Sequence, residues 1–250
     1  MAFKVYAHRG FHQNSPENTL NAFRLAYTFS PNIEIDVRLT KDRVVVVIHD
    51  EDLATTTNSQ GLVCETDFQT IRNLRTRPRD GANREDLFNE QIPSLRYILN
   101  NMPSETNYQI ELKEQGVVEP TLKCLSNARI PTERYFFTSF HLGALKEAQA
   151  QSPNAQRLLL ISPQKSYQEG YSDAGDLRER GLVFQGVGLA DTLSGMFKDR
   201  LTEEDVHRFA DEGFQVGCYL INYPERARIL QQWGVKGIVT DRIDLFKDFK

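Results

Sequence analysis

Short apolar runs alternate with amphipathic segments from one end of this 250-residue sequence to the other. Nine runs have the length and the β-branched content of strands, at 3–7, 33–37, 44–48, 108–112, 135–138, 157–161, 184–189, 216–221 and 237–240. Helical periodicity between them is clearest at 17–28, 142–150, 203–212 and 224–233. Such alternation, without a second block of different composition, is typical of a parallel α/β fold. We therefore expect a single domain over residues 1–250.

The connection between the second and third runs is too short for a crossover helix. Parallel strands need a connection of about a dozen residues or more, whereas only residues 38–43 separate these two runs. We therefore expect residues 40–43 to form a hairpin turn and 44–48 to pair antiparallel with 33–37. Eight strands then remain, which predicts a TIM-type (β/α)8 barrel with a β-hairpin after its second strand.

Residues 51–106 are the least regular part of the sequence. They are rich in polar residues, proline and glycine, as in the run R-T-R-P-R-D-G-A-N-R-E-D. We expect short helices near 67–75 and 94–100 within this segment. Because insertions at the C-terminal face of a barrel often shape access to the site, we expect an inserted cap or side wall there. A tolerated surface insertion is the alternative.

Composition excludes several classes of protein. A formal net charge of −4 offers no basic excess for nucleic acid. No window approaches the roughly 20 apolar residues that span a bilayer, so we expect no stable membrane insertion. Cys64, Cys124 and Cys218 lie far apart, which favours reduced thiols over a disulfide framework. The first residues lack a signal-peptide pattern, which predicts a cytoplasmic protein.

Acidic residues are paired on two of the predicted strands. In I-E-I-D-V at 33–37, Glu34 and Asp36 share one face of the strand. Two carboxylates directed together into a barrel mouth repel each other unless a positive charge lies between them. In Y-Q-I-E-L-K, Glu111 and Lys113 share one face in the same way. Three oxygen donors without cysteine or histidine suit one hard divalent cation, Mg²⁺ or Ca²⁺; ordinary salt bridges are the alternative.

Two histidines are expected at the same mouth of the barrel. His8 ends the first strand, which neighbours the second strand in a barrel. If residues 41–42 form a two-residue turn, stepping back along both strands places Val47 opposite Asp36 and His49 opposite Glu34. Asp50 follows as a natural partner for orienting the imidazole of His49.

These groups together predict chemistry on a phosphodiester. Two imidazoles can act as general base and general acid near neutral pH. A divalent cation with Arg9 and Lys113 forms a clamp for a phosphoryl group and for the charge of its transition state. Among the other histidines, His12 has no partner that the sequence identifies, His141 is a weaker candidate for the site, and His207 is expected on a helix surface.

Several ordered motifs resemble one known family nearly from end to end. They are A-H-R-G at 7–10, P-E-N-T at 16–19, E-I-D-V at 34–37, V-I-H-D at 47–50, T-T-N-S-Q-G-L-V at 56–63, I-P-S-L at 92–95, I-E-L-K at 110–113, T-S-F at 138–140 and G-V-K-G-I-V-T-D at 234–241. With these motifs the chain resembles the glycerophosphodiester phosphodiesterase family, which belongs to the phospholipase C-like phosphodiesterase barrels. The resemblance implies hydrolysis of a small-molecule glycerophosphodiester to sn-glycerol 3-phosphate and an alcohol.

The resemblance also implies a role for each matching position. It makes His8 and His49 the catalytic pair, Arg9 and Lys113 the phosphate-binding residues, and Glu34, Asp36 and Glu111 the metal ligands. It places Glu17 and Asn18 behind these residues, where they brace the site.

Two motifs depart from the family pattern. W-T-V-N appears as Y-L-I-N at 219–222, and T-D-x-P-D appears as T-D-R-I-D at 240–244. We expect neither departure to touch the metal or the histidines. The first puts the preference for the leaving alcohol in doubt, because Tyr219 is a candidate to line the substrate pocket.

Three alternatives remain open at this point. One is a lysophospholipase D or phospholipase C-like phosphodiesterase acting on a lipid. The second is a carbohydrate isomerase barrel, which also uses acidic metal ligands but has no need of Arg9 and Lys113 around the metal. The third is a binding protein without activity, which the complete set of acids, bases and ligands disfavours.

Overall fold

The computed structural model describes residues 3–77, 90–162, 166–191, 201–247 and 249. Its barrel strands are β1 (Lys4–Ala7), β2 (Asn32–Leu39), β4 (Asn107–Leu112), β5 (Tyr135–Ser139), β6 (Gln156–Leu160), β7 (Gly186–Ala190), β8 (Gln215–Tyr219) and β9 (Gly237–Thr240). In these described ranges the eight strands run parallel and close into a ring, because β1 pairs with both β9 and β2. The structure confirms the predicted TIM-type barrel.

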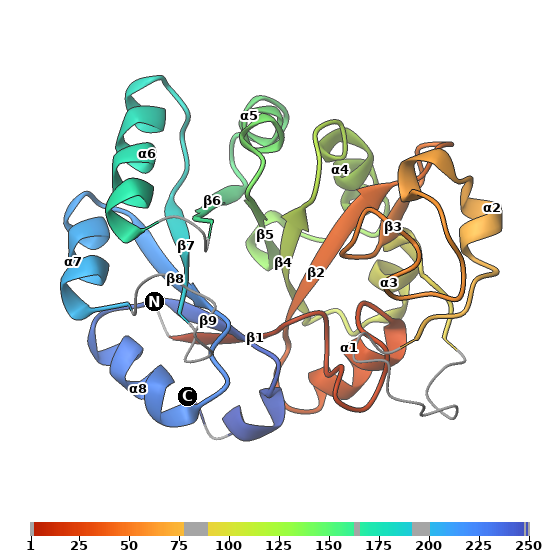
Figure 1. Cartoon of the computed structure of the whole chain (residues 1–250), viewed down its shortest axis with the longest axis horizontal. Helices are drawn as coiled ribbons and strands as arrows, with labels where there is room; N and C mark the ends of the chain where they lie inside the picture. Colours follow the sequence, from red (N-terminus) through yellow and green to blue (C-terminus); the bar gives the residue numbers. More distant parts are fainter. Residues whose placement is uncertain (1–2, 78–89, 163–165, 192–200, 248, 250) are drawn as a thin grey trace.

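Helices surround the strands on the outside of the ring (Figure 1). They are α1 (Leu20–Tyr27), α3 (Leu95–Asn101), α4 (Val118–Asn127), α5 (Leu142–Gln151), α6 (Tyr167–Glu179), α7 (Glu203–Asp211) and α8 (Pro224–Gln232). Local sequence explains several of their starts: the side chain of Thr19 caps α1, capping boxes begin α6 and α7, and proline opens α8. Helix α6 buries only Gly170 and Ala174, so its apolar periodicity is weak in the sequence.

The hairpin between β2 and β3 (Val45–Val47) exists, but its predicted register is wrong by one residue. A two-residue turn places Val47 opposite Asp36, whereas Val47 pairs with Val37. The loop after Thr40 is longer than predicted and includes Arg43, which has a φ of 60°. A three-residue loop that ends in a left-handed residue is a common hairpin connection, and it adds the extra residue.

The segment after β3 packs on the outer side of the hairpin through a small apolar cluster of its own. That cluster consists of Val46, Ile48, Leu53, Val63, Ile71 and Ile92. The short helices η1 (Val63–Glu65) and α2 (Phe68–Ile71) lie in the predicted insertion, and so does α3, which agrees with the helix predicted near 94–100. Residues 78–89 of the predicted insertion lie outside the described residues. That the insertion caps or walls the site within a single domain stays a prediction.

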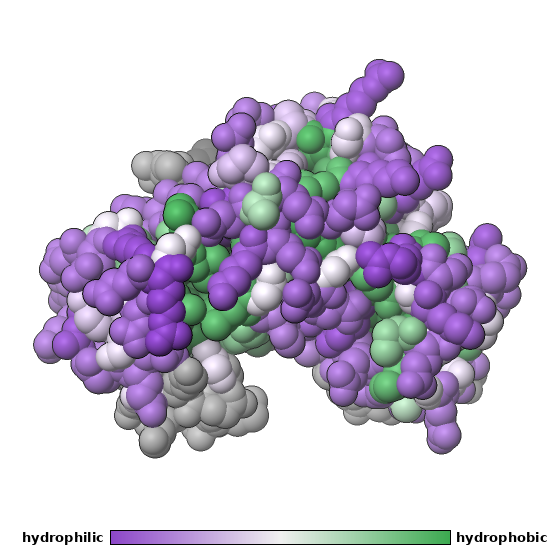
Figure 2. Space-filling view, turned by 90° about the horizontal axis from the view of Figure 1, so that it is seen from above, coloured by the Kyte–Doolittle hydropathy of each residue, from purple (hydrophilic) through white to green (hydrophobic). Residues whose placement is uncertain are grey.

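The main core lies between the strands and the helices. Ile33, Ile35 and Val37 point away from the barrel axis and are fully buried under the helices. Their alternate neighbours Glu34 and Asp36 therefore point toward the axis. Figure 2 shows one side of the molecule as mostly hydrophilic, with hydrophobic residues gathered in its recesses. Within the described ranges, no helix is both long enough and apolar enough to cross a bilayer.

Candidate active site

Three carboxylates meet at the rim where the carboxyl ends of β2 and β4 lie side by side. The strand register places Asp36 directly beside Glu111, and Glu34 lies two residues earlier on the same face of β2. One oxygen from each carboxylate can be chosen so that all three lie within 4.8 Å of one another. Glu34 is 2% exposed and Asp36 is fully buried. This brings together the three residues that the sequence predicts as metal ligands.

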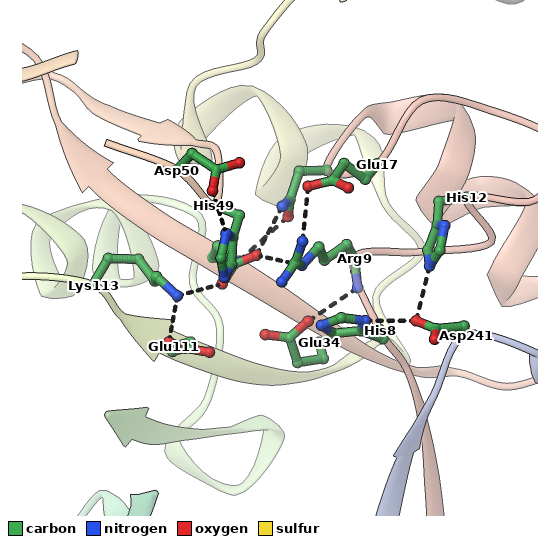
Figure 3. Close-up of polar contacts among 12 residues, drawn as sticks. His8, Arg9, His12, Glu17, Glu34, His49, Asp50, Glu111, Lys113 and Asp241 are labelled. Atoms are coloured by element: carbon green, nitrogen blue, oxygen red, sulfur yellow. Dashed lines mark hydrogen bonds and ion pairs between the residues drawn. The ribbon is translucent and has the colours of Figure 1, made fainter. Parts of the chain in front are cut away.

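Two cations lie against these carboxylates (Figure 3). Lys113 Nζ is 2.6 Å from Glu111 Oε1 and 3.5 Å from Asp36 Oδ1. Arg9 Nε is 3.2 Å from Asp36 Oδ2. Although burial acts to lower the pKa of Lys113, the two carboxylates outweigh it and raise that pKa, so the ammonium stays charged. The predicted phosphate-binding residues are thus in contact with the predicted metal ligands.

Lys113 and Arg9 compensate only part of the negative charge of the three carboxylates, which is consistent with a site for a further cation. Burial raises the pKa of Glu34 well above its ordinary value, and the charges of Asp36 and Glu111 raise it further. Burial also acts to raise the pKa of Asp36, but Lys113 and Arg9 hold it well below its ordinary value. Asp36 Oδ1 is buried and accepts no hydrogen bond from the described residues. A hard divalent cation would satisfy this oxygen and allow Glu34 to ionise.

The loop after β1 aims Arg9 at the cluster. Arg9 has a φ of 53°, and its backbone N–H donates to Glu34 Oε2 at 3.0 Å. Gly10 follows with a φ of 85° and lies against helix α1, where a Cβ would come within 2.7 Å of the backbone of Ala22. Only glycine combines that backbone conformation with such a close approach. The A-H-R-G motif therefore sets the path of the chain as well as supplying side chains.

The P-E-N-T motif, just before helix α1, holds the side chains of Arg9 and Asp36 by hydrogen bonds. Glu17 Oε1 accepts a hydrogen bond from Arg9 Nη1 at 3.0 Å. Asn18 Nδ2 donates to Asp36 Oδ2 at 2.9 Å, and its Oδ1 accepts from the backbone N–H of Asp36 at 3.3 Å. Both residues thus lie directly behind the side chains that the sequence predicts them to brace.

His8 is held by the last barrel strand. Its Nδ1 lies 2.7 Å from Asp241 Oδ1, and Asn222 Nδ2 donates to Asp241 Oδ2 at 3.0 Å. The backbone N–H of Asp241 in turn donates to Asn222 Oδ1 at 2.8 Å. Burial and the charge of Arg9 lower the pKa of His8 to about 4, although Asp241 partly offsets them. His8 is therefore neutral at pH 7, with Nδ1–H donating to Asp241 and Nε2 carrying the lone pair.

His49 reaches the site by a different route from the predicted one. Strand β3 ends at Val47, so His49 does not pair with Glu34. Its carbonyl oxygen accepts a hydrogen bond from Arg38 Nε at 2.8 Å, and its Nδ1 lies 3.0 Å from Asp50 Oδ1. Figure 3 shows His49 at the Lys113 end of the carboxylate cluster and His8 at the Asp241 end.

Three residues of this network have no role in the sequence predictions. They are Asp241, Asn222 and His12, whose Nε2 lies 2.9 Å from Asp241 Oδ1. The departures from the family pattern do not themselves bind His8, but the same two segments supply Asn222 and Asp241. The predicted topology could have identified Asp241. Thr240 ends the last strand, which neighbours the first strand in a closed barrel, so Asp241 and His8 lie at the same rim.

The remaining candidates are Tyr219, His141 and His207. Tyr219 Oη donates to the carbonyl oxygen of Ile161 at 2.6 Å, and its ring meets that of Phe140 edge to face with centroids 6.1 Å apart. Tyr219 is one of the residues that line a cavity of about 510 Å³, together with residues at or just before the amino-terminal ends of the strands, such as Lys4, Asn107 and Lys236. His141 precedes α5, and His207 lies exposed on α7, 3.9 Å from Glu203.

The comparisons with known proteins place this chain among enzymes of the phosphodiester hydrolase class. The sequence model of the Glycerophosphoryl diester phosphodiesterase family matches residues 8–245, and the chain belongs to this family.

Relatives support the same assignment along nearly the whole chain. The glycerophosphodiester phosphodiesterase of Caldanaerobacter subterraneus subsp. tengcongensis is 34% identical over 245 residues, which cover 95% of this chain and 93% of the relative. That of Bacillus altitudinis is 32% identical over 246 residues, with 95% and 94% covered.

Solved structures share the fold. A phosphodiesterase of Oleispira antarctica, solved with its product sn-glycerol-3-phosphate, superposes with a TM-score of 0.81 at 24% identity, over 98% of this chain and 95% of that one. The glycerophosphodiester phosphodiesterase of Thermotoga maritima superposes with a TM-score of 0.74 at 23% identity, over 100% of this chain and 99% of that one.

The lowered pKa of His8 predicts an unusual titration. In the folded protein the imidazole stays neutral as the pH falls and gains its proton only near pH 4. In the unfolded chain it gains that proton near the ordinary value of about 6.5, so this residue makes the fold less stable as the pH falls between these values. Imidazole NMR signals, assigned by their loss in His8→Gln, measure the midpoint. A midpoint near the ordinary value would contradict the burial and charge effects described above.

Proposed function

We propose that this chain is a metal-dependent enzyme that hydrolyses glycerophosphodiesters to sn-glycerol 3-phosphate and an alcohol. The observation that carries the proposal is the cluster of Glu34, Asp36 and Glu111, which lies between two imidazoles and against two cations at one barrel rim. The product bound in the structure from Oleispira antarctica supports sn-glycerol 3-phosphate as the retained half of the substrate. The substrate is then a small molecule; the predicted cytoplasmic location and the absence of nucleic-acid binding remain predictions.

In this proposal the three carboxylates hold one divalent cation, Mg²⁺ or Ca²⁺. When bound, the cation polarises the phosphoryl oxygens and lowers the pKa of a coordinated hydroxyl. Carboxylate oxygens alone suit either of these hard cations. Asn18 donates one hydrogen bond to the carboxylate of Asp36 and accepts another from the backbone N–H of Asp36, so that ligand is oriented before the cation arrives.

Arg9 and Lys113 bind the phosphate in this proposal. Both side chains are mostly buried at the rim, which keeps water away and strengthens their attraction for an anion. Glu17 and Asp36 orient the guanidinium of Arg9, so its planar donors are positioned before the substrate binds. The same two cations stabilise the negative charge that develops on the phosphoryl oxygens in the transition state.

The two histidines divide the proton transfers. His8 starts neutral, and its Nε2 can take the proton of the attacking hydroxyl, either the 2-hydroxyl of the glycerol or a water. Asp241 holds His8 in this tautomer and stabilises the imidazolium that forms. His49, oriented by Asp50, then donates a proton to the leaving alkoxide. On the hydroxyl route, attack of the 2-hydroxyl expels the alcohol and leaves a cyclic phosphate; a water then attacks the phosphorus, and the bond to the 2-oxygen breaks to give sn-glycerol 3-phosphate.

The histidine roles predict a difference between leaving groups. His8→Ala and His49→Ala should each lower kcat on glycerophosphocholine by about 10²–10⁴-fold, the usual contribution of a general acid or base. A p-nitrophenolate leaving group needs no proton. On a glycerophosphodiester with that leaving group, His49→Ala should therefore regain most of the kcat that it loses on glycerophosphocholine, whereas His8→Ala should not. His207→Ala, at an exposed position, is the control. Near wild-type turnover of glycerophosphocholine by either variant would contradict the assignment.

Metal and substrate are tested together. We expect EDTA to abolish turnover of several glycerophosphodiesters, Mg²⁺ or Ca²⁺ to restore it, and a coupled assay to detect sn-glycerol 3-phosphate. Lysophosphatidylcholine assayed in parallel tests the lipid alternative. Full activity in EDTA would exclude a metal-dependent reaction. Faster turnover of lysophosphatidylcholine than of every glycerophosphodiester would replace the proposed substrate class.

A further inference from the structure

Two imidazole nitrogens converge on one carboxylate oxygen beside the proposed catalytic cluster. His8 Nδ1 and His12 Nε2 lie 2.7 Å and 2.9 Å from Asp241 Oδ1. The rings are nearly perpendicular, at 77°, with centroids 6.1 Å apart. One ligand atom from each of the three residues can be chosen so that all lie within 4.8 Å of one another. This group is separate from Glu34, Asp36 and Glu111, and the role proposed above for His8 leaves His12 unused.

The chemistry of this group differs from that of the three carboxylates. Two imidazoles and one carboxylate are the protein ligands of open zinc sites, in which water or another small ligand completes the coordination. Ligands in such a site lie about 3.3 Å apart when the bonds are about 2.0 Å long and the geometry is tetrahedral. The two nitrogen–oxygen distances observed here are shorter than this by about half an ångström, so small side-chain rotations would suffice.

The surroundings of Asp241 also match those of a metal ligand. Its second oxygen accepts a hydrogen bond from Asn222 Nδ2 at 3.0 Å, and its backbone N–H donates to Asn222 Oδ1 at 2.8 Å. Such outer partners orient ligating carboxylates. The side chains of His8, His12 and Asp241 are 16%, 24% and 20% exposed, so an ion can reach them from solvent.

We propose that His8, His12 and Asp241 form a second metal site that selects Zn²⁺ and related borderline cations, and that its occupation inhibits the enzyme. Nitrogen donors favour Zn²⁺ strongly over Mg²⁺ and Ca²⁺, which the oxygen cluster prefers. Coordination of Nδ1 of His8 to Zn²⁺ replaces its hydrogen bond to Asp241 and moves the imidazole proton from Nδ1 to Nε2, so Nε2 has no free lone pair. His8 then no longer accepts a proton efficiently. The inhibition rests on the proposed role of His8, but the site itself does not.

Cobalt(II) tests the site directly, because a four- or five-coordinate nitrogen and oxygen site absorbs visible light far more strongly than a six-coordinate oxygen site. The titration is made in excess Mg²⁺, which keeps the carboxylate cluster occupied. All proteins carry Cys64→Ser, because the exposed thiol of Cys64 is itself a ligand for soft metals. We expect strong visible bands in this background and in His207→Gln, and their loss in His12→Gln. Zn²⁺ should displace the cobalt and remove the bands.

Inhibition is measured on the same proteins, each relative to its own rate without Zn²⁺. The Zn²⁺ concentration for half-inhibition should rise at least tenfold in His12→Gln and stay unchanged in His207→Gln. Equal inhibition of all three proteins would overturn the inhibitory proposal, because displacement of Mg²⁺ from the carboxylates does not depend on His12. Zinc-edge anomalous scattering from crystals of the unmodified protein needs no variant, and the absence of a peak between these residues would overturn the site. Binding without inhibition would support the site and contradict the proposed role of His8.

Discussion

The repulsion among three neighbouring carboxylates, two of them buried and one partly buried, is the constraint on which the rest of the site depends. Gathering Glu34, Asp36 and Glu111 away from water is costly unless positive charge is brought to them. Lys113 supplies part of it at 2.6 Å from Glu111, and Arg9 supplies another part at 3.2 Å from Asp36. The raised pKa of Glu34 indicates that these two cations do not complete the compensation. In our proposal a divalent cation and a phosphodiester complete the balance together, one as a positive charge and the other as a negative charge.

Closure of the barrel is what assembles this balance. His8 and Asp241 are 233 residues apart in the sequence, yet they lie 2.7 Å apart because β1 and β9 are neighbours in the ring. The P-E-N-T turn adds contacts from the start of α1 to Arg9 and Asp36. Loss of ring closure would therefore remove the tautomer control of His8 even if every site residue were present. The stability of the barrel and the orientation of the proposed catalytic groups are in this sense one property.

The sequence was informative where side-chain alternation or a short motif decided the outcome. Alternation along β2 and β4 was enough to bring Glu34, Asp36, Glu111 and Lys113 to one rim, because strand direction and face are local properties. The register of the hairpin could not be predicted in this way, because it depended on one left-handed residue, Arg43, which nothing in the residue types required. Asp241 gained its role only through a contact between the two ends of the chain, and Asn222 gained its role through its hydrogen bonds with Asp241. Helix α6 was weakly marked because little of it is buried.

The central claim is that the three carboxylates hold a divalent cation beside the two imidazoles. Mn²⁺ shares the preference of Mg²⁺ for oxygen ligands and scatters X-rays anomalously. Crystals grown in Mn²⁺ with sn-glycerol 3-phosphate should show one strong anomalous peak in contact with Glu34, Asp36 and Glu111, with the phosphate bound to that ion and to Arg9. A peak elsewhere on the protein, or a phosphate bound with no ion between the carboxylates, would contradict the account.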